Sequence, residues 1–317
     1  MWGERLIGIV LFGLVLTLAL AAFSHKVPDS AGQFLSVQTR IFDSMRPYLI
    51  GFSMVLVVIL LGLGQAKLAL LGAGGAVLIT VAMIVDYASR IAPQADTGDL
   101  SLVWFNMLET NDTSPETIAD ALRQADVDII VLAEATPARS IPELMSDSHP
   151  YRLGCEDEDQ NCGLLILSRV PLGTSRLRDL PSGRERFARV VIERPDRAPV
   201  HLLAVHMVKP WFAGFAGTEV EALEAALESE TIPPTILIGD FNAAPWSRRM
   251  RHFEQNFGLE HARFPIGTWP AQAGALGLPI DHILLRGGTA LADITPWGGD
   301  LGSNHRGLRA SIALPQD

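Results

Sequence analysis

Basic side chains are scarce in this 317-residue sequence, which holds 25 Lys and Arg against 35 Asp and Glu and has a formal net charge of −10. Residues 1–95 contain six basic and four acidic side chains, so the remainder carries 19 basic and 31 acidic ones, net −12. Binding duplex nucleic acid usually requires a basic footprint. The charge balance therefore disfavours nucleic acid as a partner without excluding it.

Two local clusters of arginine are exceptions to this excess of acidic residues. They are Arg184, Arg186 and Arg189, and then Arg248, Arg249 and Arg251. Either cluster could steer a phosphate group, but each also fits a solvated face, and we interpret both as solvated faces.

Apolar runs long enough to cross a bilayer are confined to the first 95 residues. They cover 6–23, 48–64 and 68–88, which is 18, 17 and 21 residues, and a transmembrane helix takes roughly 17 to 25. We predict a membrane domain over 1–90 with three transmembrane helices in these ranges, followed by a linker over 91–99. The lipid bilayer is then a partner, and the protein a multi-pass protein of the cell (inner) membrane. An alternative for the first run is a cleaved signal peptide.

Cysteine is nearly absent as well. The two cysteines, Cys155 and Cys162, flank a short acidic segment. A lone nearby pair in a loop can close a disulfide, which needs an oxidising compartment, although two reduced thiols are the alternative. The Lys/Arg distribution mildly prefers the opposite topology. We favour a disulfide and an extracytoplasmic C-terminal domain.

The segment Thr235–Pro245 is the most informative part of the chain. An apolar run enters Gly239, and then Asp240 and Asn242 follow two residues apart. In an extended segment such residues point to the same face, so a carboxylate and a carboxamide emerge together from the end of a buried strand. A strand end followed by an ordinary Asx turn is the alternative.

Further polar groups end or interrupt apolar strand-like runs in the same manner. They are Asn106, Glu134, His206, Asp281 with its neighbour His282, and the triplet Ser303, Asn304 and His305. We interpret His282 as a hydrogen-bonded core residue. Continuous apolar runs suit strands that are covered on both faces, and alternating strand and helix patterns indicate an α/β class.

The ordered set Asn, Glu, His, Gly-Asp-x-Asn, Asp and Ser-x-His resembles the endonuclease/exonuclease/phosphatase superfamily, the fold of pancreatic deoxyribonuclease. The resemblance covers about residues 98 to 316. It implies a catalytic domain over 100–317, in which two mixed β-sheets pack face to face with helices outside as a four-layer sandwich.

The resemblance also implies roles for the site residues. Glu134 would be the principal Mg²⁺ (or Mn²⁺) ligand, with Asn106 beside it. Asp240 would orient or deprotonate the attacking water. Asn242 and His206 would contact the scissile phosphate. His305 would act on the phosphoryl group or the leaving oxygen, with Asp281 fixing its orientation.

Two departures from the family pattern concern the metal. Asn304 stands where the family usually has a metal-supporting Asp, and an amide oxygen is a weaker ligand for a hard cation than a carboxylate. Ala133 replaces a Gln that often precedes the metal-binding Glu, which removes a hydrogen bond that could orient Glu134.

The chemistry agrees with hydrolysis of a phosphate ester. A divalent cation neutralises charge that builds in the transition state, and neutral or cationic donors stabilise the equatorial oxygens. No Ser or Cys nucleophile with a matched base stands out, so direct attack by water is expected.

The apolar, Gly-rich stretch 207–217 just after His206 favours a membrane interface, although a loop packed on the protein's own core is an equal alternative.

We therefore expect a membrane-anchored, divalent-metal-dependent phosphoesterase that acts on a membrane-associated or lipid-linked phosphate. One alternative is a membrane-tethered nuclease. Another is a sensor or scaffold built on a degenerate site, which the residues Ala133 and Asn304 would favour.

Overall fold

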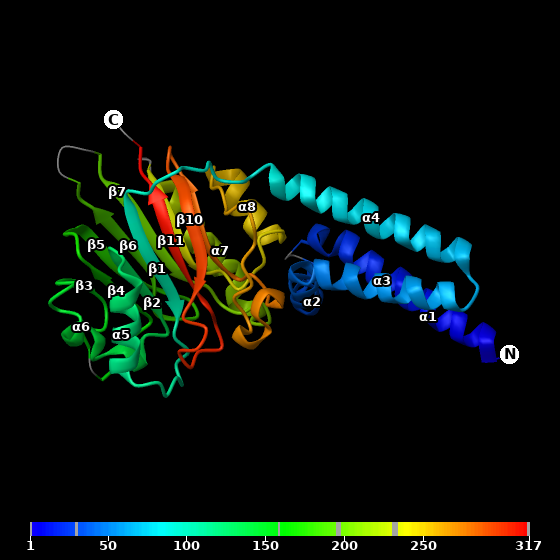
Figure 1. Cartoon of the computed structure of the whole chain (residues 1–317), viewed down its shortest axis with the longest axis horizontal. Coiled ribbons are helices and arrows are strands. Elements are labelled where there is room, and N and C mark those ends of the chain that lie inside the picture. Colours follow the sequence, from blue (N-terminus) through cyan, green and yellow to red (C-terminus); the bar gives the residue numbers. More distant parts are fainter. Residues whose placement is uncertain (1, 29–30, 158, 195–197, 230–233, 316–317) are drawn as a thin grey trace.

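The computed structural model describes residues 2–28, 31–157, 159–194, 198–229 and 234–315. Glu158 of the acidic segment and residues 316–317 of the expected catalytic domain lie outside these ranges. A helical bundle forms one end of the molecule and an α/β lobe forms the other (Figure 1).

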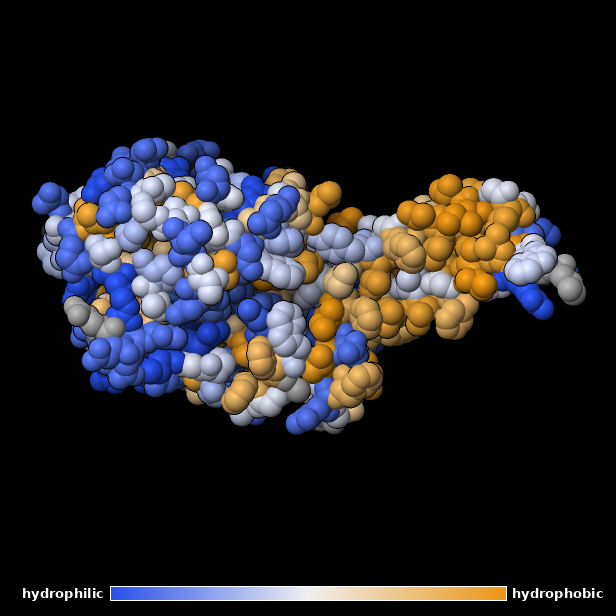
Figure 2. Space-filling view, turned by 90° about the horizontal axis from the view of Figure 1, so that it is seen from below, coloured by the Kyte–Doolittle hydropathy of each residue, from blue (hydrophilic) through white to orange (hydrophobic). Residues whose placement is uncertain are grey.

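The bundle contains helices α1 (Trp2–Phe23), α2 (Gln33–Ser44), α3 (Arg46–Gly62) and α4 (Ala66–Ala88). Helices α1, α3 and α4 pack on one another, and the hydroxyls of Thr17 and Ser53 bond across α1 and α3 at 2.7 Å. Gly72 permits this close packing, because a Cβ there would lie 2.6 Å from a methyl carbon of Leu14. Apolar side chains cover the outside of the bundle, as a membrane span requires (Figure 2).

The predicted count of three membrane-spanning helices needs correction. Two helical stretches, Trp2–Lys26 and Ala66–Ala88, are long and apolar enough to cross a membrane. The predicted second span corresponds to the 17-residue helix α3, which meets α2 at 74°, and a third span results only if this bent pair counts as one. The apolar run itself contains no sign of this bend.

Eleven strands in the described part of the chain form two sheets. The first has the order β10-β11-β1-β2-β4-β3 and the second β5-β6-β7-β8-β9. The bounds are β1 Leu100–Asn106, β2 Ile129–Ala133, β3 Tyr151–Leu153, β4 Leu164–Ser168, β5 Leu172–Leu180, β6 Gly183–Ile192, β7 Val200–His206, β8 Thr235–Asp240, β9 Asp281–Arg286, β10 Ala290–Trp297 and β11 Gly307–Ala313. Within them, β1 pairs with β2 and β7 with β8 in parallel, and both sheets are mixed.

The two sheets pack face to face, with helices on their outer faces (Figure 1). Alternate residues such as Leu102, Trp104 and Ile238 fill the space between the sheets. The outer helices are α5 (Pro115–Ala125) and the short α6 (Ile141–Leu144) on the first sheet, and α7 (Ala213–Ser229) and α8 (Arg248–Phe257) on the second. This confirms the four-layer architecture. Because both faces of each central strand are covered, those strands read as continuous apolar runs.

The segment predicted as a linker, 91–99, lies fixed along the α/β lobe. Ala92 N donates to His261 O, and His261 N donates to Arg90 O. Farther along, Leu291 N donates to Pro93 O. The end of α4 is therefore joined to the lobe by backbone pairing.

The single disulfide joins Cys155 and Cys162, whose Cα atoms are 5.1 Å apart. This confirms the predicted pairing. The bridge closes the loop between β3 and β4, and the Cys162 side of it is buried against the outer face of the first sheet.

Candidate active site

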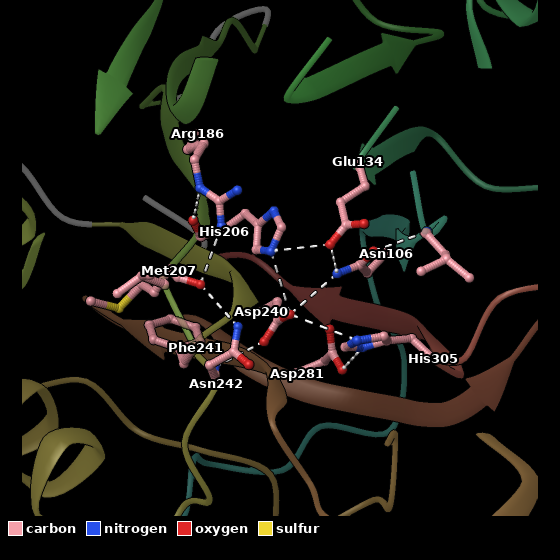
Figure 3. Close-up of polar contacts among 12 residues, drawn as sticks. Asn106, Glu134, Arg186, His206, Met207, Asp240, Phe241, Asn242, Asp281 and His305 are labelled. Carbon is pink, nitrogen blue, oxygen red and sulfur yellow. Dashed lines mark hydrogen bonds and ion pairs between the residues drawn. The ribbon is translucent and has the colours of Figure 1, made fainter. Parts of the chain in front are cut away.

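The candidate site lies where the parallel strands of both sheets end. Asn106 ends β1, and Glu134 follows β2 directly. In the second sheet His206 and Asp240 end β7 and β8 as register partners, and Asp240 is also the partner of Asp281 at the start of β9. Since the two sheets are stacked with these ends together, side chains far apart in sequence converge (Figure 3).

Asn106 connects the carboxylates of the two sheets. Its Nδ2 donates to Glu134 Oε1 at 3.4 Å and to Asp240 Oδ2 at 3.2 Å. The other oxygen of Glu134 accepts from the backbone N–H of Glu109 at 2.8 Å. Glu134 is 18% exposed at its side chain, whereas Asp240 is buried. Glu134 is thus the carboxylate most open to a ligand.

Two site residues have left-handed backbones, which L side chains rarely adopt. Glu134 has φ of 50° and Asn242 has φ of 48°. Asn tolerates this region, and Asn242 is held there by its N–H, which donates to Asp240 Oδ1 at 2.8 Å. Glu gains no such relief, so its backbone costs about 1–3 kcal/mol, which contacts such as those of its carboxylate with Glu109 N and Asn106 Nδ2 must offset.

His305 and Asp281 form a buried pair. His305 Nδ1 and Asp281 Oδ2 are 2.9 Å apart, and the indole N–H of Trp104 donates to Asp281 Oδ1 at 2.7 Å. The Ser303 hydroxyl fixes the loop, because it donates to Asn106 O at 2.6 Å and accepts from the backbone N–H of His305 at 2.9 Å. The contact predicted between Asp281 and His305 is therefore present, and Nε2 of the imidazole faces Asp240, 3.9 Å from its Oδ2.

The mutual attraction of His305 and Asp281 shifts the pKa values of both. Burial opposes the charge on His305, but attraction to Asp281 and the hydrogen bond between them outweigh it and raise the pKa of His305 to about 9. Burial likewise opposes the charge on Asp281, yet His305 holds the pKa of Asp281 below its ordinary value. The imidazole is therefore a cation at neutral pH.

The pKa values of Asp240 and His206 shift in the reverse directions to those of Asp281 and His305. Burial, and then the charge of Asp281, raises the pKa of Asp240 to about 7. Burial, and then the nearby Arg186, lowers the pKa of His206 well below its ordinary value. His206 Nε2 lies 3.6 Å from Glu134 Oε1 and 3.7 Å from Asp240 Oδ2. Asp240 is thus poised to gain or lose a proton near pH 7, while His206 stays neutral.

A cavity of about 220 Å³ opens beside these groups. Its lining includes Glu134, His206, Arg186 and Lys209, and two aromatic rings, Phe212 and Phe215, form an apolar wall. Arg186 Nε donates to His206 O at 2.9 Å, which turns the guanidinium into the site (Figure 3). The interpretation of Arg186 as part of a solvated face is therefore wrong. Only the register of β6 against β7 could have revealed its direction.

The residues present fit a divalent cation. Three carboxylates gather here, and Glu134, the one most open to a ligand, offers hard oxygen atoms. One oxygen each of Asp240 and Asp281 and one nitrogen of His305 lie within 4.8 Å of one another, but Asp281 and His305 already bind each other. A cation at Glu134 would also require the amide of Asn106 to turn, because Asn106 now presents its Nδ2 to the carboxylates.

The other predicted residues are also near the site. Asn242 lies beside Asp240, and its Nδ2 donates to Met207 O at 2.9 Å. Asn304 precedes His305, and among the described residues its buried Oδ1 has no hydrogen-bond partner. His282 Nε2 is 2.8 Å from Ala243 O, which agrees with the core role expected for it.

Comparisons with known proteins agree with this geometry. The sequence matches the model of the Endonuclease/Exonuclease/phosphatase family over residues 103–305. No curated protein matches the chain.

Solved structures share the fold. The endonuclease/exonuclease/phosphatase from Beutenbergia cavernae DSM 12333 has a TM-score of 0.55 and 18% identity, over 68% of this chain and 72% of that one. TDP2 from D. rerio, complexed with single strand DNA product, has a TM-score of 0.53 and 16% identity over 68% and 99%. A beta toxin mutant from Staphylococcus aureus with bound magnesium ions has a TM-score of 0.52 and 15% identity over 67% and 99%.

Proposed function

We propose, because this chain belongs to the Endonuclease/Exonuclease/phosphatase family, that it is a membrane-anchored, divalent-metal-dependent phosphoesterase. The observation that carries the proposal is the convergence of Glu134, Asp240 and the Asp281–His305 pair from separate strands into one cluster, which meets the cavity at Glu134. Such pairs of titratable groups, with pKa values pushed apart by their surroundings, are typical of acid–base sites.

The residues have distinct roles in this proposal. Asp240 accepts the proton of the attacking water, since its pKa of about 7 suits a general base at neutral pH. His305, charged and oriented by Asp281, donates a proton from Nε2 to the leaving oxygen. Asn242, His206 and Arg186 surround the phosphate oxygens. Asp240 Oδ2 and His305 Nε2 lie 3.9 Å apart, so the base and the acid face the same part of the site.

Glu134 would hold Mg²⁺ or Mn²⁺ in this proposal, and the amides of Asn106 and Asn304 would contribute further oxygen atoms. When bound, the cation neutralises negative charge that develops on the phosphoryl oxygens. The bound magnesium of the similar beta toxin supports this assignment. Glu134 lines the cavity, and Asn106 Nδ2 lies 3.4 Å from its Oε1.

A lipid-linked or membrane-proximal phosphate is the substrate class that the surroundings favour. Trp211, Phe212 and Phe215 are 44–49% exposed beside the cavity. The same segment touches the bundle, because Arg40 of α2 donates to Pro210 O at 3.4 Å. Exposed aromatic rings at the level where a bundle meets a soluble lobe favour the bilayer interface. The substrate can then enter from the lipid side.

The second candidate is a membrane-tethered nuclease. The similar TDP2 binds single strand DNA product, and Arg186 and Lys209 line the cavity. The net charge of −12 over residues 96–317 opposes nucleic acid binding. A non-catalytic sensor or scaffold is the third candidate, and the departures at Ala133 and Asn304 are what favour it.

We place the protein in the cell (inner) membrane as a multi-pass protein with an extracytoplasmic catalytic domain. The apolar helices α1 and α4 support the membrane anchor. The Cys155–Cys162 disulfide supports the outward side, since disulfides persist in oxidising compartments.

A substrate panel tests the function. Purified full-length protein with Mg²⁺ is assayed on lipid phosphates in mixed micelles, short single-stranded DNA and a water-soluble alkyl phosphodiester. Turnover of the lipid phosphate that is lost in Asp240→Asn supports the proposal. Faster cleavage of DNA would favour the nuclease, and no turnover with either cation would favour the scaffold. Glu116→Gln, a change on the exposed first turn of α5, is the matched control.

A further inference from the structure

Another cavity lies at the junction between the bundle and the α/β lobe. It has a volume of about 510 Å³, within the range of about 300–1,000 Å³ that ligand pockets occupy. The first turns of α3, the last turns of α4 and the segment 263–265 enclose it, and its lining includes Ile50, Met83, Ile84, Trp246, Phe264 and Arg263. We propose that this cavity binds one phospholipid molecule, with an acyl chain inside it and the phosphate on Arg263.

Apart from Arg263 at the rim, the lining is mainly apolar and accepts hydrocarbon. Its two hydroxyl groups already have partners, because Tyr87 Oη donates to Ala262 O at 2.7 Å and Thr80 Oγ1 donates to Ala76 O at 2.8 Å. A water molecule needs two to four polar partners to be stable in a cavity. An apolar chain is therefore the occupant that this space favours.

The bilayer is the source of that chain. The wall of the cavity continues into the apolar outer surface of the bundle, where Val81, Ile84 and Val85 are 51%, 60% and 64% exposed. Once α4 spans the membrane as proposed above, lipid chains cover this surface. The cavity then extends the hydrocarbon layer beneath the lobe, so this inference rests on the membrane placement.

Arg263 supplies the contact for the headgroup. It is exposed at the rim, its guanidinium lies 5.5 Å from the centre of the Phe264 ring, and no ion pair involves it among the residues that the structure describes. A guanidinium binds phosphate through two parallel hydrogen bonds. Because the cavity lies at the end of α4 nearest the lobe, Arg263 is at the level of the phosphate groups.

A lipid in this position would brace the catalytic site from behind. Its chain packs on Tyr87, and its phosphate and chain both contact the segment 263–265. A few residues further on, the Thr268 hydroxyl accepts from the backbone N–H groups of Ile280 and Asp281 at 3.2 and 3.3 Å. A ligand that binds only the folded state stabilises it, so this segment gains stability when the lipid is bound.

Trp246 gives a direct readout because its side chain lines the cavity. Full-length protein is reconstituted into vesicles whose phospholipid carries bromine on its acyl chains, and the emission that disappears in Trp246→Phe is assigned to Trp246. We expect most of this emission to be quenched relative to unbrominated vesicles. Ala88→Phe, which fills the cavity, should restore it, and Leu71→Phe, on the lipid-facing surface far from the cavity, should not.

The headgroup contact is tested in the same vesicles. When brominated phosphatidylglycerol is diluted into unbrominated phosphatidylcholine, Arg263→Gln should require a several-fold higher fraction of it for half quenching. Ala88→Leu serves as a milder filling variant if Ala88→Phe does not fold. Equal Trp246 emission in brominated and unbrominated vesicles, with the protein incorporated, would overturn the lipid site while leaving the hydrolytic function untouched. Failure of the protein to enter vesicles at all would overturn the membrane placement and this site with it.

Discussion

Replacing Asp281 by Asn tests the acid–base pair most directly. The charge of Asp281 and its 2.9 Å contact are the largest influences that raise the pKa of His305 from 6.5 to about 9. Without them, burial is opposed only by the more distant carboxylates, and the pKa of His305 falls toward its ordinary value. The variant keeps the shape of the side chain and an oxygen for the Trp104 indole, so the change is mainly in charge.

The expected loss follows from the fraction of His305 that carries a proton. At pH 8 this fraction is about 0.9 for a pKa of about 9 and about 0.03 for a pKa of 6.5, so the rate falls about 30-fold. The limb of the pH profile on the alkaline side should move from about pH 9 toward neutrality. The limb set by Asp240 should move to lower pH as well, because Asp281 no longer repels its carboxylate.

The assay is the pH dependence of kcat/KM for an alkyl phosphodiester, whose leaving oxygen needs a proton. An aryl ester with an acidic phenol as leaving group is the matched control, and its rate should fall much less because it needs little protonation. An alkaline limb that stays near pH 9 in Asp281→Asn would refute the assignment of His305 as the acid. Equal losses for the alkyl and aryl esters would point instead to a structural role for Asp281.

Three further changes test the rest of the site. Glu134→Gln should weaken Mg²⁺ binding by about 100-fold or more in a calorimetric titration, since even outer partners of a ligand are worth about 10–100-fold; unchanged binding would remove Glu134 as the ligand. Asn304→Asp should tighten Mg²⁺ binding, because the buried Oδ1 without a partner would become a carboxylate oxygen, and an identical titration would show that Asn304 lies outside the cation's shell. Replacing Cys155 and Cys162 together by Ser should lower the free energy of unfolding by roughly 2–3 kcal/mol in a denaturant titration, and two free thiols in freshly isolated wild-type protein would contradict the disulfide.

The positions of the candidate site residues were predictable because these residues stand at strand ends. Asp240 and Glu134 each follow an unbroken apolar run, and the first polar side chain after such a run marks the edge of a covered sheet. Arg186 carries no such signal. It lies within β6, where polar and apolar residues mix, so only the pairing with β7 decides which side of the sheet it reaches.

The membrane part shows the same limit. Run lengths predict where apolar helices lie, and α1, α3 and α4 follow the three runs closely. Helix α2 was not predicted, because Gln33–Ser44 mixes polar and apolar residues and resembles a connecting segment. At the 74° bend, Pro47 stands in the first turn of α3, and Asp43 and Ser44 at the end of α2 contact the α/β lobe. The proline favours a helix start there, but the sequence alone does not give the angle.

The junction between bundle and lobe bears on how the proposed enzyme would meet its substrate. Arg90 pairs with the buried Glu254 of α8, Trp246 donates its indole N–H to Ser44 O, and Tyr48 donates its hydroxyl to Leu276 O. These contacts attach the α/β lobe rigidly to the bundle. A domain on a flexible tether samples many heights and tilts above a bilayer, and most of its encounters with substrate are unproductive. With the bundle in a bilayer as proposed, a rigidly attached lobe holds its opening at a constant height and angle above the membrane. Its search for substrate is then two-dimensional, and it reaches only the nearest layer of molecules.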